Sequence, residues 1–148
     1  MKPQFSPLTT QNSEPYFELH KQGQFSAWSQ KIFENCLSKP YFGYSLDQDN
    51  QPLGYYIAMQ VLDEVTLMDI VVSPAHQGNG LGKSLMQHLM GQCNQNKINQ
   101  IWLEVRESNA AAINLYDNAG FILVEQRVNY YPCAKGKEDA LIMCCYLG

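Results

Sequence analysis

The residues whose spacing most suggests chemistry are three glycines that stand between an apolar run and an amphipathic segment. Glycines allow a phosphate group to approach backbone N–H groups closely, and the start of a helix leaves such groups unpaired beside the positive end of its dipole. The spacing therefore predicts a cradle for a diphosphate-bearing cofactor. The residues of this glycine loop are Gln77, Gly78, Asn79, Gly80, Leu81, Gly82 and Lys83.

Three phosphate-binding motifs compete for the glycine loop. The nucleoside-triphosphate motif G-x-x-x-x-G-K-[ST] would need a glycine at Gln77, and the dinucleotide motif G-x-G-x-x-G would need one at Lys83. The pattern Q/R-x-x-G-x-G/A fits Gln77, Gly80 and Gly82. It resembles the loop with which GCN5-related N-acetyltransferases, the GNAT superfamily, hold the pyrophosphate of acetyl-CoA. For the loop alone, an ordinary glycine-rich turn remains the alternative.

A second group of residues lies one predicted strand beyond the glycine loop. Asn109, Ala112, Tyr116, Gly120 and Phe121 fit the pattern N-x-x-A-x-x-x-Y-x-x-x-G-F, the second signature of the same superfamily. Taken singly, these residues would serve as a helix cap, a close packing contact, a core aromatic and a helix stop. Because both signatures occur in order and at the right distance, the chain resembles the GNAT superfamily.

Further runs are similar to one group within the superfamily, the ribosomal-protein alanine N-acetyltransferases (the RimI group). These runs are residues 64–67, 102–106, 108–113, 129–132 and 138–140. The resemblance implies an α/β (α+β) GNAT fold, with a mixed, mostly antiparallel sheet of six to seven strands, about four helices, and strands splayed at the acetyl-CoA site. It also implies acetyl transfer from acetyl-CoA to the N-terminal amine of a ribosomal protein, with alanine first, by direct attack in a ternary complex.

The same resemblance implies roles for single residues. Glu104 matches the general base and Tyr116 the general acid, while Tyr130 and Tyr131 are expected to form a wall of the groove for the acceptor peptide. For Glu104 the alternative is a solvent-facing glutamate paired with Arg106. The implied cofactor contacts come from the strand beside the pantetheine arm, the glycine loop and the cap of the second signature: Ile70, Val71, Val72, residues 77–83 and Asn109.

Two other functions stay open. The first is an N-acetyltransferase for a small amine, such as a polyamine or an aminoglycoside, which would need a deep acidic pocket in place of an open groove. The second is a regulatory module that binds CoA without turnover. The presence of both Glu104 and Tyr116 argues against a module without turnover.

Composition narrows the class of protein. The 148 residues, 45% of them apolar, fit a single domain over residues 1–148. The net charge of −4 and the lack of a Lys or Arg run argue against nucleic acid, and no apolar stretch approaches the ~20 residues of a membrane span. Five cysteines without a C-x-x-C pair and three scattered histidines predict neither a disulfide framework nor a metal site. We therefore expect a soluble, cytoplasmic monomer.

The elements that must position these residues follow from periodicity. Residues 67–72 form an apolar, β-branched run that predicts a strand, and Leu81, Leu85, Leu89 and Cys93 recur at helical spacing after the loop. Residues 101–106 alternate as a strand does, so strand, helix and strand predict a parallel crossover. The second signature predicts a helix over residues 110–119.

The flanking regions complete the expected architecture. Runs at 41–46 and 53–62 predict a hairpin that leads into the central strand, and the last two strands are expected at 121–128 and 140–147, joined through 129–132 and a charged loop. At the N-terminal end we expect an edge strand at 5–8 and a helix capped by Asn12 or Ser13. Ser29 should cap a second helix that buries Ile32, Phe33, Cys36 and Leu37.

Overall fold

The structure is a computed structural model that describes residues 2–24 and 26–148. Within these ranges the chain forms seven β-strands, four α-helices and one short 3-10 turn. In chain order they are β1 (Gln4–Pro7), α1 (Glu14–Gly23), α2 (Gln30–Asn35), β2 (Tyr41–Gln48), β3 (Gln51–Val61), β4 (Glu64–Val72), η1 (Pro74–His76), α3 (Leu81–Gln95), β5 (Gln100–Arg106), α4 (Ala110–Asn118), β6 (Ile122–Cys133) and β7 (Gly136–Tyr146).

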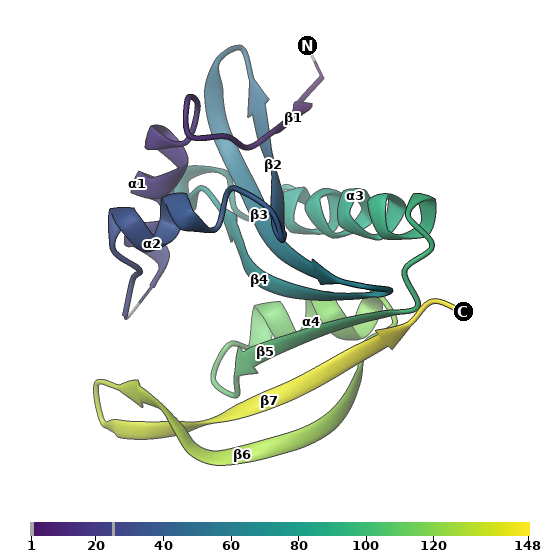
Figure 1. Ribbon diagram of the computed structural model, residues 1–148. Helices are drawn as coiled ribbons and strands as arrows, with labels where there is room; N and C mark the ends of the chain where they lie inside the picture. The colour runs from purple at the N-terminus through teal and green to yellow at the C-terminus, as the bar shows by residue number, and fades with distance from the viewer. Residues whose placement is uncertain (1, 25) are drawn as a thin grey trace.

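The seven strands form one mixed sheet in the order β1-β2-β3-β4-β5-β7-β6. Among the paired strands of the described chain, β4 and β5 run parallel and the other pairs run antiparallel. Helix α3 makes the crossover between β4 and β5, as Figure 1 shows. The expected mixed, mostly antiparallel sheet with about four helices is therefore confirmed.

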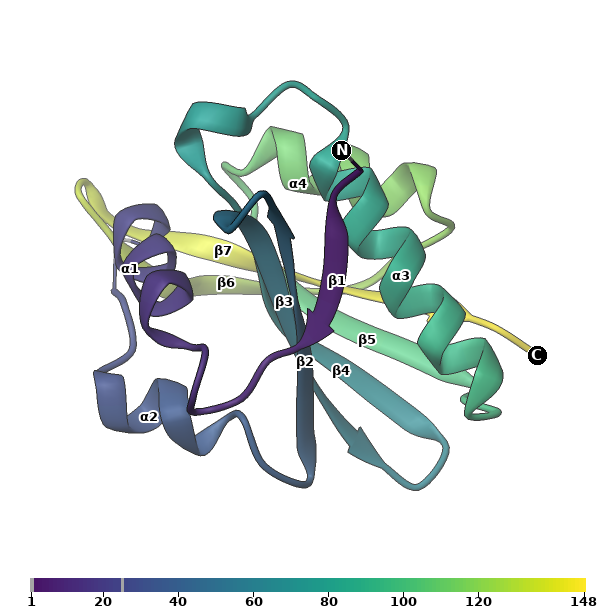
Figure 2. The ribbon, with the colours of Figure 1, turned by 90° about the horizontal axis from the view of Figure 1, so that it is seen from above.

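Helices cover both faces of the sheet (Figure 2), and β3 shows how the sequence divides the core between them. Its side chains alternate, so Tyr55 and Ile57 pack with residues of α1 and α2, while Tyr56 and Ala58 pack with residues of α3 and α4. All four of these side chains are fully buried. The sheet is thus the shared middle layer of two apolar cores.

Strands β4 and β5 separate along part of their length, and this fork positions the site. Their pairing runs from Glu64↔Gln100 to Leu67↔Leu103, and no further pair joins them in the described chain. On its other edge β4 stays paired with β3 up to Val72, although a register shift leaves Met68 without a partner there. From Met68 to Val72, one edge of β4 is therefore left unpaired by strands.

The C-terminal hairpin differs from the expected one. Residues 129–132, expected to join two strands, lie inside β6, which continues to Cys133 and turns directly into β7. A register shift between Arg127 and Tyr131, with Asn129 at a positive φ of 54°, interrupts the ladder without ending it. The turn-like composition of this segment marks an irregularity in a long strand, because β7 supplies partners on both sides of it.

The helical caps are close to expectation, and one core assignment is wrong. Ser29 accepts a hydrogen bond from the Ile32 N–H and caps α2, whereas Ser13 precedes α1 without a side-chain capping bond. Ile32 was expected in the core but is 49% exposed. Helix α2 has only six residues, so its single buried position within the helix is Phe33.

Within residues 2–24 and 26–148, no helix combines the length and the apolar character that a membrane crossing requires.

Candidate active site

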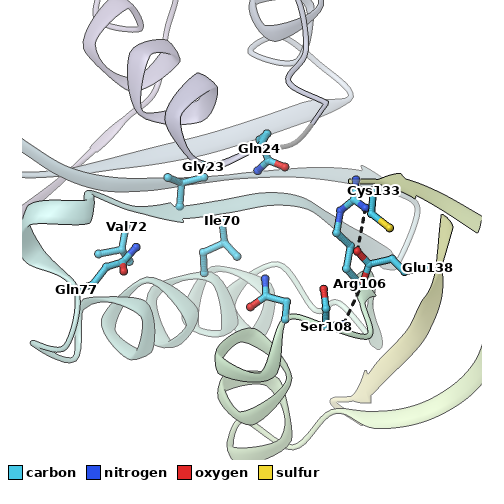
Figure 3. Close-up of a pocket in the computed structure, with 11 residues that line it drawn as sticks. Gly23, Gln24, Ile70, Val72, Gln77, Arg106, Ser108, Cys133 and Glu138 are labelled. Atoms are coloured by element: carbon cyan, nitrogen blue, oxygen red, sulfur yellow. Dashed lines mark hydrogen bonds and ion pairs between the residues drawn. The ribbon is translucent and has the colours of Figure 1, made fainter. Parts of the chain in front are cut away.

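The fork between β4 and β5 opens into two adjoining clefts. The loop-side cleft, shown in Figure 3, has a volume of about 520 Å³ and is lined by Val71 and Val72 of β4, by Gln77 of the glycine loop and by residues from β5 to β7. The tyrosine-side cleft has a volume of about 550 Å³ and contains Glu104 and Tyr116. The two clefts share four lining residues: Gln24, Ile70, Arg106 and Asn109.

The free edge of β4 forms one side of both clefts. Ile70, Val71 and Val72 were expected to lie beside the pantetheine arm of a cofactor, and all three line the loop-side cleft. Because their β5-facing edge has no strand partner, its backbone N–H and C=O groups can bond to an extended ligand. The arrangement offers the hydrogen bonds of a missing strand.

The glycine loop leads from the loop-side cleft to the start of α3. Gly78 and Gly80 have positive φ values of 85° and 76°, and Gly80 is the N-cap of α3. A Cβ at either position would meet no atom within 4 Å, so backbone conformation, and not crowding, requires glycine there. Gly80 has no side chain to cap the helix, which leaves the first N–H groups of α3 open to an anion.

The other loop residues differ in surroundings. Gln77 lines the loop-side cleft, whereas Asn79 and Lys83 are exposed near the helix start. Leu81 packs against the core, and a Cβ at Gly82 would lie 3.5 Å from Leu115 in ordinary contact. The loop is thus exposed from Gln77 to Gly80 and again at Lys83, whereas Leu81 and Gly82 are partly buried.

Glu104 lies on β5 in the tyrosine-side cleft, with its side chain 37% exposed. The Tyr131 hydroxyl donates a hydrogen bond of 3.0 Å to Oε2, and Arg127 Nη1 lies 3.5 Å from Oε1. Arg106, considered as a partner for Glu104, instead donates to the Pro132 carbonyl at 2.7 Å and pairs with Glu138 at 3.4 Å. Two residues of strand β6, Tyr131 and Arg127, therefore orient Glu104.

Tyr116 lies on α4 and is 5% exposed, with its ring packed against Phe121 at 5.9 Å between centroids. It lines the same cleft as Glu104. Burial raises the pKa of the Tyr116 hydroxyl above its ordinary value, and the negative charge of Asp69 raises it further. At neutral pH the hydroxyl is protonated and can donate a hydrogen bond into the cleft.

The two tyrosines expected to form a groove wall have separate positions. Tyr131 lines the tyrosine-side cleft, and the Arg106 guanidinium covers its ring at 4.6 Å. Burial and then the charge of Glu104 raise the pKa of Tyr131, so it stays a hydrogen-bond donor to that carboxylate. Tyr130 is 46% exposed and packs edge-on against Tyr131, outside the lining of both clefts.

Asn109 combines two positions. Its side-chain oxygen accepts a hydrogen bond of 3.2 Å from the Ala112 N–H and caps α4, and the residue also lines both clefts. Capping is a common role for asparagine at the start of a helix. It does not compete with a ligand contact, since the side-chain amide nitrogen is a separate group.

The sequence did not predict a buried polar cluster that lies at the tyrosine-side cleft. Asp69, on β4, accepts hydrogen bonds from Gln24 and Tyr55 and lies 2.7 Å from His20. A charged residue inside the apolar run 67–72 was the available signal, but its partners come from distant parts of the sequence. Across residues 2–24 and 26–148, no three His, Cys, Asp or Glu side chains gather as a metal site would require.

Comparison with known proteins gives a consistent picture. The chain matches the acetyltransferase (GNAT) family over residues 6–121. It is 40% identical over 135 residues to the [ribosomal protein bS18]-alanine N-acetyltransferase of Haemophilus influenzae, covering 90% of this chain and 92% of that protein. The crystal structure of the ribosomal-protein-S18-alanine N-acetyltransferase from Escherichia coli superposes with a TM-score of 0.95 at 36% identity, covering 99% and 95% of the two chains.

A more distant structure shows the same fold with a ligand. Arabidopsis thaliana NAA60 in complex with acetyl-CoA superposes with a TM-score of 0.88, covering 99% of each chain. Its sequence is 16% identical, so this likeness concerns the fold alone.

Proposed function

Because the chain belongs to the acetyltransferase (GNAT) family, we propose that it transfers the acetyl group of acetyl-CoA to the N-terminal amine of a ribosomal protein whose first residue is alanine. The observation that carries the proposal is the presence of Glu104 and Tyr116 in one cleft beside an unpaired strand edge. Amine acetylation needs a group that accepts a proton and a group that donates one, and these two side chains are of those types. The acceptor is proposed from the relatives named for that reaction. As part of the same proposal, the reaction would occur in the cytoplasm.

Acetyl-CoA would lie along the fork. The amide groups of its pantetheine arm need hydrogen-bond partners, and the edge of β4 at Ile70, Val71 and Val72 has unpaired groups of that kind. Its pyrophosphate would lie at the glycine loop, where the open N–H groups and the dipole of α3 favour an anion. When bound, it supplies a thioester carbonyl that an amine can attack.

Glu104 would accept the proton of the acceptor amine. Tyr131 and Arg127 orient its carboxylate while leaving the side chain accessible from the cleft. An α-amine with a pKa near 8 is already partly neutral at pH 7, whereas a lysine amine near 10.4 is not. A carboxylate is accordingly better matched to an N-terminus than to a lysine side chain.

Tyr116 would act on the leaving sulfur as a hydrogen-bond donor. Proton transfer from a phenol of pKa near 10 to the thiolate of a thiol near 8.5 is uphill by about 2 kcal/mol, and burial raises the pKa of Tyr116 further. Stabilisation of the developing thiolate by a retained O–H is therefore the larger part of its role. Complete protonation of the thiol would follow from solvent.

Acetylation of defined peptides tests the proposed function. The protein is incubated with acetyl-CoA and hexapeptides that differ only in the first residue, and products are identified by mass spectrometry. We expect acetylation at the α-amine of the alanine peptide and none of a peptide whose N-terminus is already blocked. Spermidine and an aminoglycoside serve as competing acceptors, and a preference for either would contradict the proposal.

The cofactor assignment has its own measurement. Gly80→Val places a β-branched residue at a positive φ, so the loop must rearrange, and we expect the Kd for acetyl-CoA to rise by about tenfold or more. Gly91→Val lies on the exposed face of α3 and is the matched control. If calorimetry gives both variants the same affinity for acetyl-CoA, the pyrophosphate does not bind at the glycine loop.

A further inference from the structure

A chain of buried hydrogen bonds connects β4 with the segment that follows α1. On β4, Asp69 Oδ2 lies 2.7 Å from His20 Nδ1, and on the other side of the same ring His20 Nε2 lies 2.9 Å from the backbone N of Trp28. His20 is 2% exposed and Asp69 8% exposed. The proposed acetylation chemistry uses neither side chain.

The donors and acceptors in this series of hydrogen bonds fix the tautomer of His20. A backbone N–H can only donate, so His20 Nε2 must accept with its lone pair and carry no proton. The ring proton is then on Nδ1, where it is donated to Asp69. His20 is thus a neutral imidazole with a defined orientation.

Asp69 is held in place by two more donors. The Tyr55 hydroxyl donates to Oδ2 at 2.5 Å, and Gln24 Nε2 donates to Oδ1 at 3.1 Å. Burial and the charge of Asp69 raise the pKa of Tyr55, so this hydroxyl remains a donor at any physiological pH. The carboxylate is therefore fixed from β3, from α1 and from the segment after α1.

The last group of the chain, Trp28, forms part of a cleft wall. Its ring stacks on His20 with centroids 4.8 Å apart and an interplanar angle of 29°. Trp28, Gln24 and His20 all line the tyrosine-side cleft, as does Glu104 of β5. The position of this wall relative to Glu104 consequently depends on one imidazole that is bonded at both nitrogens.

We propose that His20, oriented by Asp69, is a positioning residue that fixes Trp28 and thereby sets the width of the cleft that receives the acceptor's N-terminus. The inference rests on the proposed function for the nature of the acceptor. Its consequence is specific: loss of the link should weaken binding of the acceptor peptide and leave binding of acetyl-CoA unchanged, because the glycine loop lies at the other cleft.

Two substitutions separate positioning from packing. His20→Phe keeps a stacking ring but breaks both hydrogen bonds, and we expect the KM for the alanine hexapeptide to rise about tenfold, with kcat and the KM for acetyl-CoA nearly unchanged. His20→Gln can offer an amide N–H to Asp69 and an amide oxygen to the Trp28 N–H, so it should restore the peptide KM to within about threefold of wild type.

His88→Phe is the matched control. His88 is also a stacked histidine, with Phe5 at 4.0 Å and a 2.8 Å hydrogen bond to the Tyr56 hydroxyl, but it lines neither cleft. It should leave the peptide KM unchanged. An unchanged peptide KM in His20→Phe, or an equal rise in the KM values for both substrates, would overturn the proposal.

A measurement on the wild-type protein remains decisive where a variant does not fold. Two-dimensional ¹H–¹⁵N spectra of the imidazole rings should show His20 with a proton on Nδ1 and an unprotonated Nε2. A proton on Nε2 would overturn the inference. Failure of the wild-type protein to acetylate every peptide would instead count against the proposed function, while the spectrum would still report the His20 link.

Discussion

Asp69 and Glu104 are carboxylates on the neighbouring strands β4 and β5, at the same fork, in opposite surroundings. The Asp69 side chain is 7% exposed and accepts hydrogen bonds from three elements of the fold. The Glu104 side chain is 37% exposed, with one hydrogen bond of 3.0 Å and one long contact of 3.5 Å. A carboxylate surrounded by donors serves structure, whereas one with an accessible oxygen can exchange a proton with a substrate.

The difference follows from which strands flank each residue. Strand β4 is covered by α1 and paired with β3, and both contribute polar groups to Asp69. At Glu104, strand β5 is paired with β7, and the donors reach Glu104 from β6, one strand further out. Charge alone therefore does not distinguish the two carboxylates. The number and burial of their donors do, and this difference is why we propose Glu104, and not Asp69, as the proton acceptor.

The largest effect should come from Glu104→Gln. Glutamine is nearly isosteric but cannot accept the amine proton, so kcat/KM should fall about 10³-fold at pH 7 without a loss of stability. It should recover partly above pH ~8, where the substrate α-amine deprotonates in water, whereas a lysine acceptor would recover near 10.4. An equal loss across the pH profile would show that Glu104 binds substrate without moving a proton.

Asp69→Ala should show the opposite profile, with stability as the main loss. The substitution leaves buried donors of His20, Tyr55 and Gln24 without an acceptor, and we expect the free energy of unfolding to fall by about 3 kcal/mol. Glu104→Ala, at an exposed position, should change it by about 0.5 kcal/mol or less. Urea titrations of both variants measure the contrast, and equal destabilisation would end the distinction between the two carboxylates.

Tyr116→Phe extends the comparison to a buried group that we place in the chemistry. The ring and its packing against Phe121 remain, so stability and acetyl-CoA affinity should be retained. Loss of the hydroxyl should lower kcat about 10²-fold. A kcat close to that of wild type would show that Tyr116 is a core aromatic residue. Like Asp69, it would then have a structural role and no role in the chemistry.

The smallest effect should come from Tyr131→Phe, which removes the closest donor to Glu104. We expect a loss of about threefold in kcat/KM, since Arg127 still orients the carboxylate.

Tyr131 also predicts a direction with pH. Its pKa is raised in the fold, so the stability it contributes is fully present below the ordinary tyrosine value near 10 and is lost as pH rises through the raised value. The free energy of unfolding of wild type should therefore drop more steeply above pH ~10 than that of Tyr131→Phe. Parallel curves would show that the hydroxyl is not differentially stabilised.

Much of the architecture was accessible from periodicity and turn chemistry. The apolar run before the glycine loop, the helical spacing after it and the alternation at 101–106 predicted β4, α3 and β5, because each pattern is local. The length of β6 was not accessible, since residues 129–132 have turn-like composition and only pairing with β7 keeps them extended. The place where β4 and β5 separate is likewise set by packing between distant elements.

The site divides in the same way. Glu104, Tyr116, Asn109, Gln77 and the strand 70–72 line the two clefts as a group, and the sequence motifs named them. The partner of Glu104 was not accessible from sequence, because Arg127 and Tyr131 reach it across the sheet from more than 20 residues away. The roles of the motif residues in catalysis and cofactor binding stay predictions, which the experiments above test.

The interrupted pairing of β4 also bears on self-association. A row of free backbone groups at the outer edge of a sheet is a template on which other chains can add and aggregate. Here the free edge lies in the middle of the sheet, between β3 and β5 and with helices on both faces (Figure 1). Another folded protein cannot bring its own sheet edge to it, while a slender extended molecule can enter. The protein can thus keep a strand edge with unpaired backbone groups permanently open. It does not need the charged residues or prolines that prevent aggregation at an outer edge.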